Sequence, residues 1–213
     1  MKTDELITLL ATRATSERQS AAAVALWRAV ALGLLGALLI LLAGYRMNPA
    51  LPQLLGQPMF WLKLGAPALV AASAGWALTR LARPGVAPGH VGWGIALALA
   101  LLWGVALAQW LGAPVTERAA LLWGQTWRSC PFSIGLMALP VLLAALRAMR
   151  ELAPTRLRLA GATAGALAGG AGAAVYALHC PEFAAPFLAV WYVLGMALPV
   201  VLGAALGPRV LRW

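Results

Sequence analysis

Two cysteines are the residues of this sequence best suited to chemistry. Each is followed by a proline, in Ser129-Cys130-Pro131 and in His179-Cys180-Pro181. Because proline fixes φ and favours the first turn of a helix, each cysteine is predicted to stand at the start of a helix. The positive end of a helix dipole stabilises a thiolate, so both thiols are expected to be more reactive than ordinary ones.

Four interpretations of this pair stay open. The first is a redox- or metal-responsive pair, the second a permanent structural disulfide, and the third a stable metal site. In the fourth, the two cysteines are unrelated residues that only contribute to packing. His179 and Glu182 flank Cys180, and with Cys130 these side chains would complete a four-ligand shell for a zinc- or cadmium-like ion. The chain has no Cys-x-x-Cys motif, which argues against an oxidoreductase of the thioredoxin kind.

The composition decides what kind of element must position the thiols. Of the 213 residues, 62% are hydrophobic and 10% are charged, whereas soluble domains carry about 25% charged residues. A soluble globular domain is therefore excluded. Six acidic residues and two histidines leave few candidates for a charged catalytic centre, so no enzymatic activity is predicted.

Six apolar stretches approach the roughly 20 residues that a helix needs to cross a bilayer. They are residues 24–44, 60–78, 91–111, 132–146, 159–178 and 184–206. The first is too long for a cleavable signal peptide and is expected to stay as an anchor. The sequence therefore predicts an all-α integral membrane protein, with six transmembrane helices within residues 23–213.

The basic residues are distributed unevenly between the two sides of this topology. With the N-terminus inside, only four of the 16 Lys and Arg residues lie outside: Arg46, Lys63, Arg118 and Arg128. By the positive-inside rule, both termini are placed in the cytoplasm of a bacterial inner membrane. The net charge of +10 is then explained by topology, with the lipid bilayer and not nucleic acid as the surroundings. Both cysteines fall on the outer side, in a compartment that permits disulfides.

Two patterns concern how the helices pack. The second, fourth and sixth stretches share a segment around Pro67, Pro140 and Pro199, which predicts three repeated helical hairpins unless the similarity is coincidental. The fifth stretch has glycines at four-residue spacing from Gly161 to Gly169. Such a stripe lets a second helix approach closely, and a partner within the same chain is preferred to a dimer.

The longest outer loop precedes Cys130. Thr116-Glu117 resembles a helix start, and Trp123 and Trp127 are four residues apart. These features predict a short helix at the membrane interface with both indoles on one face.

Residues 1–22 form the one sizeable polar segment. Leucines at helical spacing give it an apolar stripe, while Asp4 and Glu5 suit the positive end of a helix. A short amphipathic helix with an acidic start is suited to a partner's apolar groove. A helix lying on the inner membrane surface is the alternative.

The sequence resembles the NrsF-type membrane anti-sigma factors of Gram-negative bacteria. The resemblance rests on the opening residues 1–7, the element Phe60-Trp61-Leu62-Lys63, the two Cys-Pro sites and the pair Trp191-Tyr192. It implies a membrane regulator that holds an extracytoplasmic-function sigma factor and releases it under metal or oxidative stress.

The resemblance also implies roles for individual residues. Cys130 and Cys180 would be the sensing thiols, with a transient metal ion as the one conceivable cofactor. The sigma-binding segment would include Asp4, Glu5, Leu6, Ile7, Leu9 and Leu10. A small membrane transporter or transporter subunit is the main alternative, but the predicted spans lack the acidic residues that ion pathways use. A membrane thiol oxidoreductase ranks third.

Overall fold

The structure is a computed structural model that describes residues 23–212, apart from residues 84, 87–88, 90–91 and 153. The described residues form helices and loops and contain no strand. The first helix, Ala23–Tyr45, ends in a π-helical turn at Leu41–Tyr45. It is followed by α2 (Leu51–Leu54), α3 (Pro58–Leu81), α4 (Gly92–Gly112), α5 (Val115–Trp123), α6 (Cys130–Glu151) and α7 (Leu157–Tyr176). The last helix comprises α8 (Ala185–Phe187), a π-helical turn (Leu188–Tyr192) and α9 (Val193–Val210).

Five helices in the described ranges are long and apolar enough to cross a membrane. They are Ala23–Tyr45, Gly92–Gly112, Cys130–Glu151, Leu157–Tyr176 and Ala185–Val210. Each contains most of one predicted stretch. The remaining stretch, 60–78, lies inside α3, which has 24 residues but carries Lys63 and Arg80 and is not among the five.

The fourth predicted stretch, 132–146, ends too early. Helix α6 begins at Cys130 and continues through Arg147 and Arg150 to Glu151. A prediction based on apolar residues stops at the first arginine. The helix itself continues, because Arg and Glu are good helix formers.

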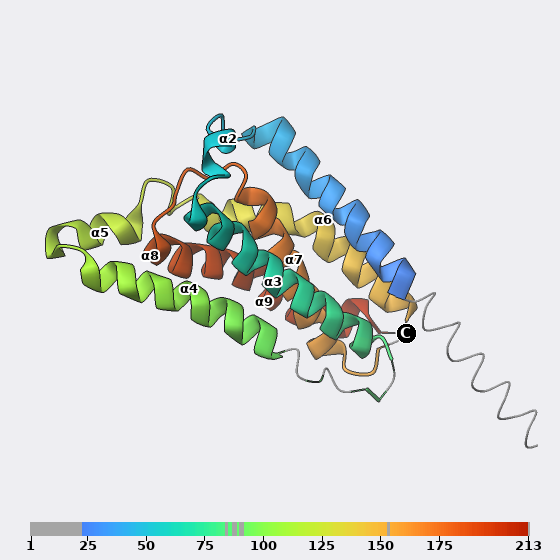
Figure 1. Ribbon diagram of the computed structural model, residues 1–213. Helices are drawn as coiled ribbons and strands as arrows, with labels where there is room; N and C mark the ends of the chain where they lie inside the picture. The colour runs from blue at the N-terminus through green and yellow to red at the C-terminus, as the bar shows by residue number, and fades with distance from the viewer. Residues whose placement is uncertain (1–22, 84, 87–88, 90–91, 153, 213) are drawn as a thin grey trace, which may run out of the picture.

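The helices run between two ends of an elongated bundle (Figure 1). At one end lie the start of the first helix and the C-terminal ends of α3, α6 and α9. At the other end lie α2, α5 and α8. We call the first the basic end, because Arg80, Arg147, Arg150 and Arg209 belong to it, and the second the thiol end, because both cysteines lie there.

Helix α7 lies at the centre of the bundle and packs against α3, α6 and α9. Its glycines make this possible: a β-carbon on Gly161 would collide with the Gly203 carbonyl, and one on Gly165 with the Pro199 carbonyl of α9. The stripe therefore serves packing within the chain, as preferred from the sequence. Close backbone approach of this kind replaces large side chains as the source of contact between membrane helices.

The prolines of the predicted repeat lie inside α3, α6 and α9. Each touches a glycine of another helix: Pro67 faces Gly170, Pro140 faces the first helix, and Pro199 faces Gly165. Proline frees a carbonyl of its own helix, which close neighbours can help to satisfy. The three repeated hairpins themselves stay a prediction.

Candidate functional site

The two cysteines lie together in the core of the thiol end. Both are 0% exposed, both are free thiols, and both belong to the same buried cluster. Cys130 is the first residue of α6, whereas Cys180 lies in the segment between α7 and α8. The fold thus brings together the two thiols that the sequence keeps 50 residues apart.

The predicted position of Cys180 at the start of a helix is wrong. Its backbone N–H donates to the Tyr176 carbonyl at 3.0 Å, which closes the end of α7. The next helix begins only at Ala185, with Pro186 in its first turn. The Cys-Pro pattern identified a helix boundary, but Cys180 lies at the end of one helix and not at the beginning of the next. The helix-dipole argument therefore applies to Cys130 alone.

Lys63 of α3 holds the segment that carries Cys180. Its ammonium donates hydrogen bonds to the Cys180 carbonyl and, at 2.8 Å, to the Glu182 carbonyl. It also lies 4.3 Å from the centre of the Phe183 ring. The Lys63 side chain is 1% exposed, so α3 places a fully buried cation beside the two thiols. The sequence places Lys63 among four outer charges and in one element of the family resemblance, but it does not predict this role.

Glu182 ties the same segment to the link between α5 and α6. One carboxylate oxygen accepts hydrogen bonds from the Gln125 N–H at 2.6 Å, the Thr126 N–H at 3.0 Å and the Thr126 hydroxyl at 3.2 Å. Hydrogen bonds to a carboxylate are stronger than those between neutral groups. The turn around Gly124, which has a φ of 51°, presents these donors to the carboxylate.

The His179 side chain, like that of Glu182, makes its contacts away from the two thiols. Its Nδ1 atom lies 2.9 Å from the Arg46 carbonyl, and its ring packs against Tyr45 and Tyr176. Within the described ranges, no three His, Cys, Asp or Glu side chains are grouped so that they could hold a metal ion. The structure therefore brings Cys130 and Cys180 together but does not join His179 and Glu182 to them as a ligand set.

Aromatic side chains close the thiol pair off from its surroundings. Tyr176 and Tyr192 are buried, with ring centres 6.0 Å apart. The Tyr45 hydroxyl donates to Ser133 at 3.0 Å. The Tyr192 hydroxyl is buried beside Cys180, and no well-formed hydrogen bond satisfies it in the described part of the chain.

The surroundings of Cys180 favour its thiolate. Hydrogen bonding by the Cys130 thiol is the largest influence and lowers the pKa of the Cys180 thiol below its ordinary value. Burial, the next largest, raises that pKa, and the Lys63 ammonium lowers it again. An anion at Cys180 is therefore stabilised by hydrogen bonding and by a nearby positive charge.

The outer tryptophans pack as a cluster, although not on one helix. Helix α5 ends at Trp123, because Gly124 turns the chain, so the prediction of Trp123 and Trp127 on one helical face is wrong. Their rings nevertheless lie 4.8 Å apart, and both contact Trp191 of the last helix. Trp191 also donates to the Leu122 carbonyl at 2.9 Å. This cluster attaches α5 to the helix that follows Cys180.

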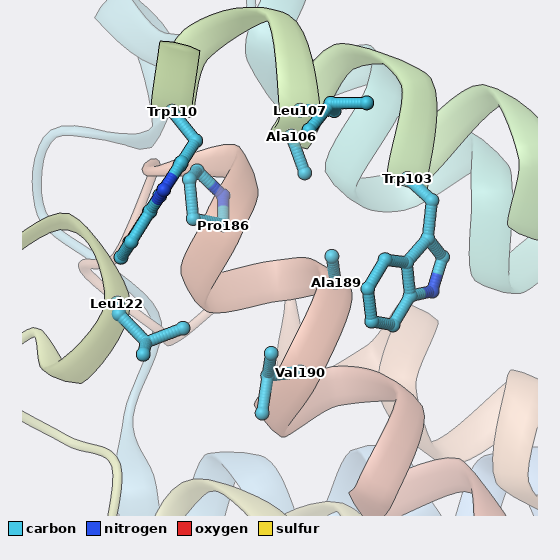
Figure 2. Close-up of a pocket in the computed structure, with 8 residues that line it drawn as sticks. All are labelled: Trp103, Ala106, Leu107, Trp110, Leu122, Pro186, Ala189 and Val190. Atoms are coloured by element: carbon cyan, nitrogen blue, oxygen red, sulfur yellow. The ribbon is translucent and has the colours of Figure 1, made fainter. Parts of the chain in front are cut away.

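A separate groove lies between α4, α5 and the start of the last helix (Figure 2). Trp103 and Trp110 of α4 stand on one side, and Pro186 and Val190 on the other. Every lining surface is apolar, so this groove offers no acid, base or nucleophile. The candidate site is the thiol pair with Lys63. The predicted sigma-binding residues Asp4, Glu5, Leu6, Ile7, Leu9 and Leu10 lie outside the described residues.

Known proteins resemble this chain over its whole length. A family model described as "Negative regulator of sigma F" matches residues 10–213. The "Probable anti-sigma-F factor NrsF" of Azospira oryzae is 43% identical over 213 residues, covering 100% of both chains. The "Anti-sigma-F factor NrsF" of Caulobacter vibrioides is 39% identical over 215 residues, again covering 100% of both. No solved structure matches the chain. The chain therefore belongs to the NrsF family of negative regulators of sigma F.

Proposed function

We propose that this protein is a membrane-bound anti-sigma factor of the bacterial inner membrane, and that it sequesters an extracytoplasmic-function sigma factor. The observation that carries the proposal is the full-length similarity to two proteins named anti-sigma-F factors. A regulator of this kind works by binding and release, so it requires no catalytic centre.

The membrane arrangement follows from the two ends of the bundle. α3 runs between the same ends as its neighbours (Figure 1), so we include it as a sixth span. Lys63 is acceptable in that span because it is buried near the thiol end and hydrogen-bonded to carbonyls, as expected of a charge within a membrane. The basic end then faces the cytoplasm, together with both termini, and the thiols lie toward the periplasm.

The sigma factor would bind at the basic end. We assign residues 1–22 as the binding segment, with Asp4, Glu5, Leu6, Ile7, Leu9 and Leu10 as its contacts. The described part of the first helix begins at Ala23 at that end of the bundle. A binding segment joined to this helix would be displaced by any change in how the helix packs.

Cys130 and Cys180 would be the sensing thiols for metal or oxidative stress. Their place in one buried cluster favours a paired response, since a disulfide needs neighbouring sulfurs. The four-ligand metal set would require His179 and Glu182 to leave their present hydrogen bonds. We therefore favour oxidation of the thiol pair over a stable metal site.

The segment 180–185 is suited to pass such a change to the helices. It is bonded to Lys63 of α3, to Gln125 and Thr126 before α6, and, through the Ala185 N–H at 2.8 Å, to Gln109 of α4. A signal requires two packings of the helices with different affinities for sigma. Linking the sulfurs would shift a segment that three parts of the bundle hold.

Membrane fractionation tests the proposal. Full-length protein is co-expressed with an extracytoplasmic-function sigma factor encoded in the same genome, and the sigma factor is measured in the membrane fraction before and after addition of the thiol oxidant diamide. We expect sigma to be retained in the membrane and to move to the soluble fraction after oxidation. Sigma that stays soluble throughout would contradict the anti-sigma function. Sigma that stays bound after both thiols are shown to be oxidised would contradict the sensing role alone.

A further inference from the structure

The groove between α4, α5 and the last helix has the shape of a slot and a volume of about 210 Å³. Figure 2 shows Trp103 and Trp110 at its two ends, about two turns or 10 Å apart along α4. Two buried alanines, Ala106 and Ala189, form part of the lining between the indoles, and larger side chains at these positions would fill the space. The groove therefore suits a narrow chain better than a compact ligand.

The chemistry of the lining selects hydrocarbon. All of the lining surface is apolar, so water finds no partner there, and an apolar cavity of about 150 Å³ stays dry and binds benzene instead. Trp103 and Leu107 are 52% and 58% exposed, which leaves the groove open along α4. Helix α4 is suited to cross a membrane, so its exposed side chains face lipid. The bilayer itself then supplies a matching occupant, an acyl chain.

One wall of the groove is an irregular part of the last helix. Two lining residues, Ala189 and Val190, belong to the π-helical turn Leu188–Tyr192. Turns of this kind are rare and are frequently found at functional sites. Trp191 of the same turn donates to the Leu122 carbonyl of α5 at 2.9 Å. A ligand in the groove would therefore lie against a turn that is already attached to α5.

A cation lies at the end of the groove that Trp110 marks. The Arg118 guanidinium donates to the carbonyls of Leu111 and Ala113, at 3.4 and 3.2 Å, and these residues follow Trp110 closely in the chain. Arg118 also precedes the lining residue Leu122 by one turn of α5. A guanidinium has five N–H donors, so donors remain for a phosphate, which arginine binds well.

We propose that this groove binds a glycerophospholipid of the outer leaflet, with one acyl chain between Trp103 and Trp110 and the phosphate at Arg118. The inference rests on the membrane arrangement of the proposed function, in which the thiol end faces the periplasm. Helix α5 fits this placement, because it lies at the thiol end (Figure 1) and has no buried residue. Tryptophans beside it are typical of the headgroup level of a bilayer.

Photo-cross-linking of the full-length protein in proteoliposomes tests the site. The probe is phosphatidylglycerol with a diazirine in the middle of one acyl chain, diluted into vesicles of unlabelled phosphatidylglycerol and phosphatidylethanolamine. Labelled peptides are quantified by mass spectrometry. We expect the label to concentrate on residues 103–110 and 186–190. Even labelling of all lipid-facing helices would show boundary lipid only and would overturn the inference.

A second probe tests the phosphate in the unaltered protein. Diacylglycerol with the same diazirine chain has no phosphate to meet Arg118. It should label the groove about tenfold less than the phospholipid does, as expected for the loss of one hydrogen bond to a charged group. Equal labelling of the groove by the two probes would overturn the assignment of the phosphate to Arg118.

Substitutions test the two parts of the site separately. Leu107→Trp places an indole in the groove and should reduce labelling of residues 186–190 to the level of other lipid-facing segments. The matched control is Leu101→Trp, at an exposed α4 leucine outside the lining, which should leave that labelling unchanged. Arg118→Gln should lower phospholipid labelling about tenfold and leave diacylglycerol labelling unchanged. Arg118→Lys, which keeps the positive charge, should lose less.

The variants can also contradict the site. Unchanged labelling in Leu107→Trp or in Arg118→Gln would overturn the inference. So would an equal loss with both probes in Arg118→Gln, because the arginine would then only support the junction of α4 and α5. If a variant does not accumulate, the comparison of the two probes in the wild type decides. Sigma binding is measured separately, so failure of the anti-sigma function leaves these labelling patterns interpretable.

Discussion

Gly165 of α7 lies so close to the Pro199 carbonyl of α9 that a β-carbon on the glycine would overlap the carbonyl oxygen. The same relationship joins Gly161 to the Gly203 carbonyl one turn away. Because α7 also packs against α3 and α6, this contact helps to fix the centre of the bundle.

Gly165→Ala should therefore destabilise the protein. The two helices must separate to admit the methyl group, and overpacking of a tight contact costs roughly 1–3 kcal/mol. We expect the Tm in detergent, followed by tryptophan fluorescence, to fall by roughly 2–12 °C. Gly104→Ala is the control, since no atom lies within 4 Å of a β-carbon built there. That change should be neutral or slightly stabilising, because alanine favours helix by about 1 kcal/mol over glycine. An equal fall in the Tm of both variants would mean that the contact between Gly165 and Pro199 does not contribute to the loss of stability.

The helices could be predicted from the sequence, whereas the site could be predicted only in part. Apolar stretches of bilayer length identify membrane-spanning helices almost independently of how those helices pack against one another. Five of the six predicted stretches correspond to helices suited to cross a membrane. The burial of Lys63 could not be foreseen, because it depends on carbonyls about 120 residues away that become available only in the folded chain. The role of Glu182 was misjudged for a similar reason: its donors are backbone N–H groups, which leave no signature in a sequence.

The orientation of the bundle gives a second prediction. Reporter fusions after Arg83, Arg150 and Trp213 should be active in the cytoplasm, and fusions near Gln57 and Arg118 in the periplasm. The expectation rests on the excess of basic residues at one end. Paired alkaline phosphatase and fluorescent protein fusions at each site give opposite signals and control for expression. Reversed signals at any two sites would place the thiols in the cytoplasm and contradict the six-span arrangement.

The N-terminal segment gives a third prediction. Leu6→Asp or Leu10→Asp should abolish co-purification of the sigma factor, because an unpaired charge buried in an apolar interface costs several kcal/mol. Membrane insertion should be unaffected, since residues 1–22 precede the first span. Thr8→Asp, at a polar position of the same segment, is the matched control for added charge. If sigma still co-purifies with both leucine variants, the binding surface lies elsewhere at the basic end, with the segment 147–158, which joins the end of α6 to the start of α7, as the best candidate.

A fourth prediction concerns the attachment of the Cys180 segment through Glu182. Glu182→Ala removes the acceptor of three hydrogen bonds and should lower the free energy of unfolding by about 2–3 kcal/mol, the range for bonds to a charged group. Glu182→Gln keeps an acceptor oxygen and should cost less. Glu117→Ala, at an exposed position of α5, should change stability by less than about 0.5 kcal/mol. Denaturant titration of the three variants checks whether the loss of stability decreases from Glu182→Ala to Glu182→Gln to Glu117→Ala. An unchanged free energy of unfolding in Glu182→Ala would show that the segment is held mainly by Lys63.

The last prediction concerns the thiols as a unit. Cys130→Ser and Cys180→Ser should each abolish release of sigma on oxidation while leaving sigma binding intact, because a disulfide needs both sulfurs. The double variant should add little to either single change, as expected for two members of one interaction. Non-reducing mass spectrometry of the wild type should show loss of two hydrogens after oxidation, and neither serine variant should form an intramolecular disulfide.

The single variants separate this mechanism from its competitors. Serine retains a hydrogen-bonding hydroxyl in place of the thiol, so each variant should fold if the reduced pair is the resting state. Failure to accumulate would instead favour a permanent structural disulfide. Loss of the response in Cys180→Ser alone would indicate a single reactive thiol. That outcome would remove Cys130 from the signalling step.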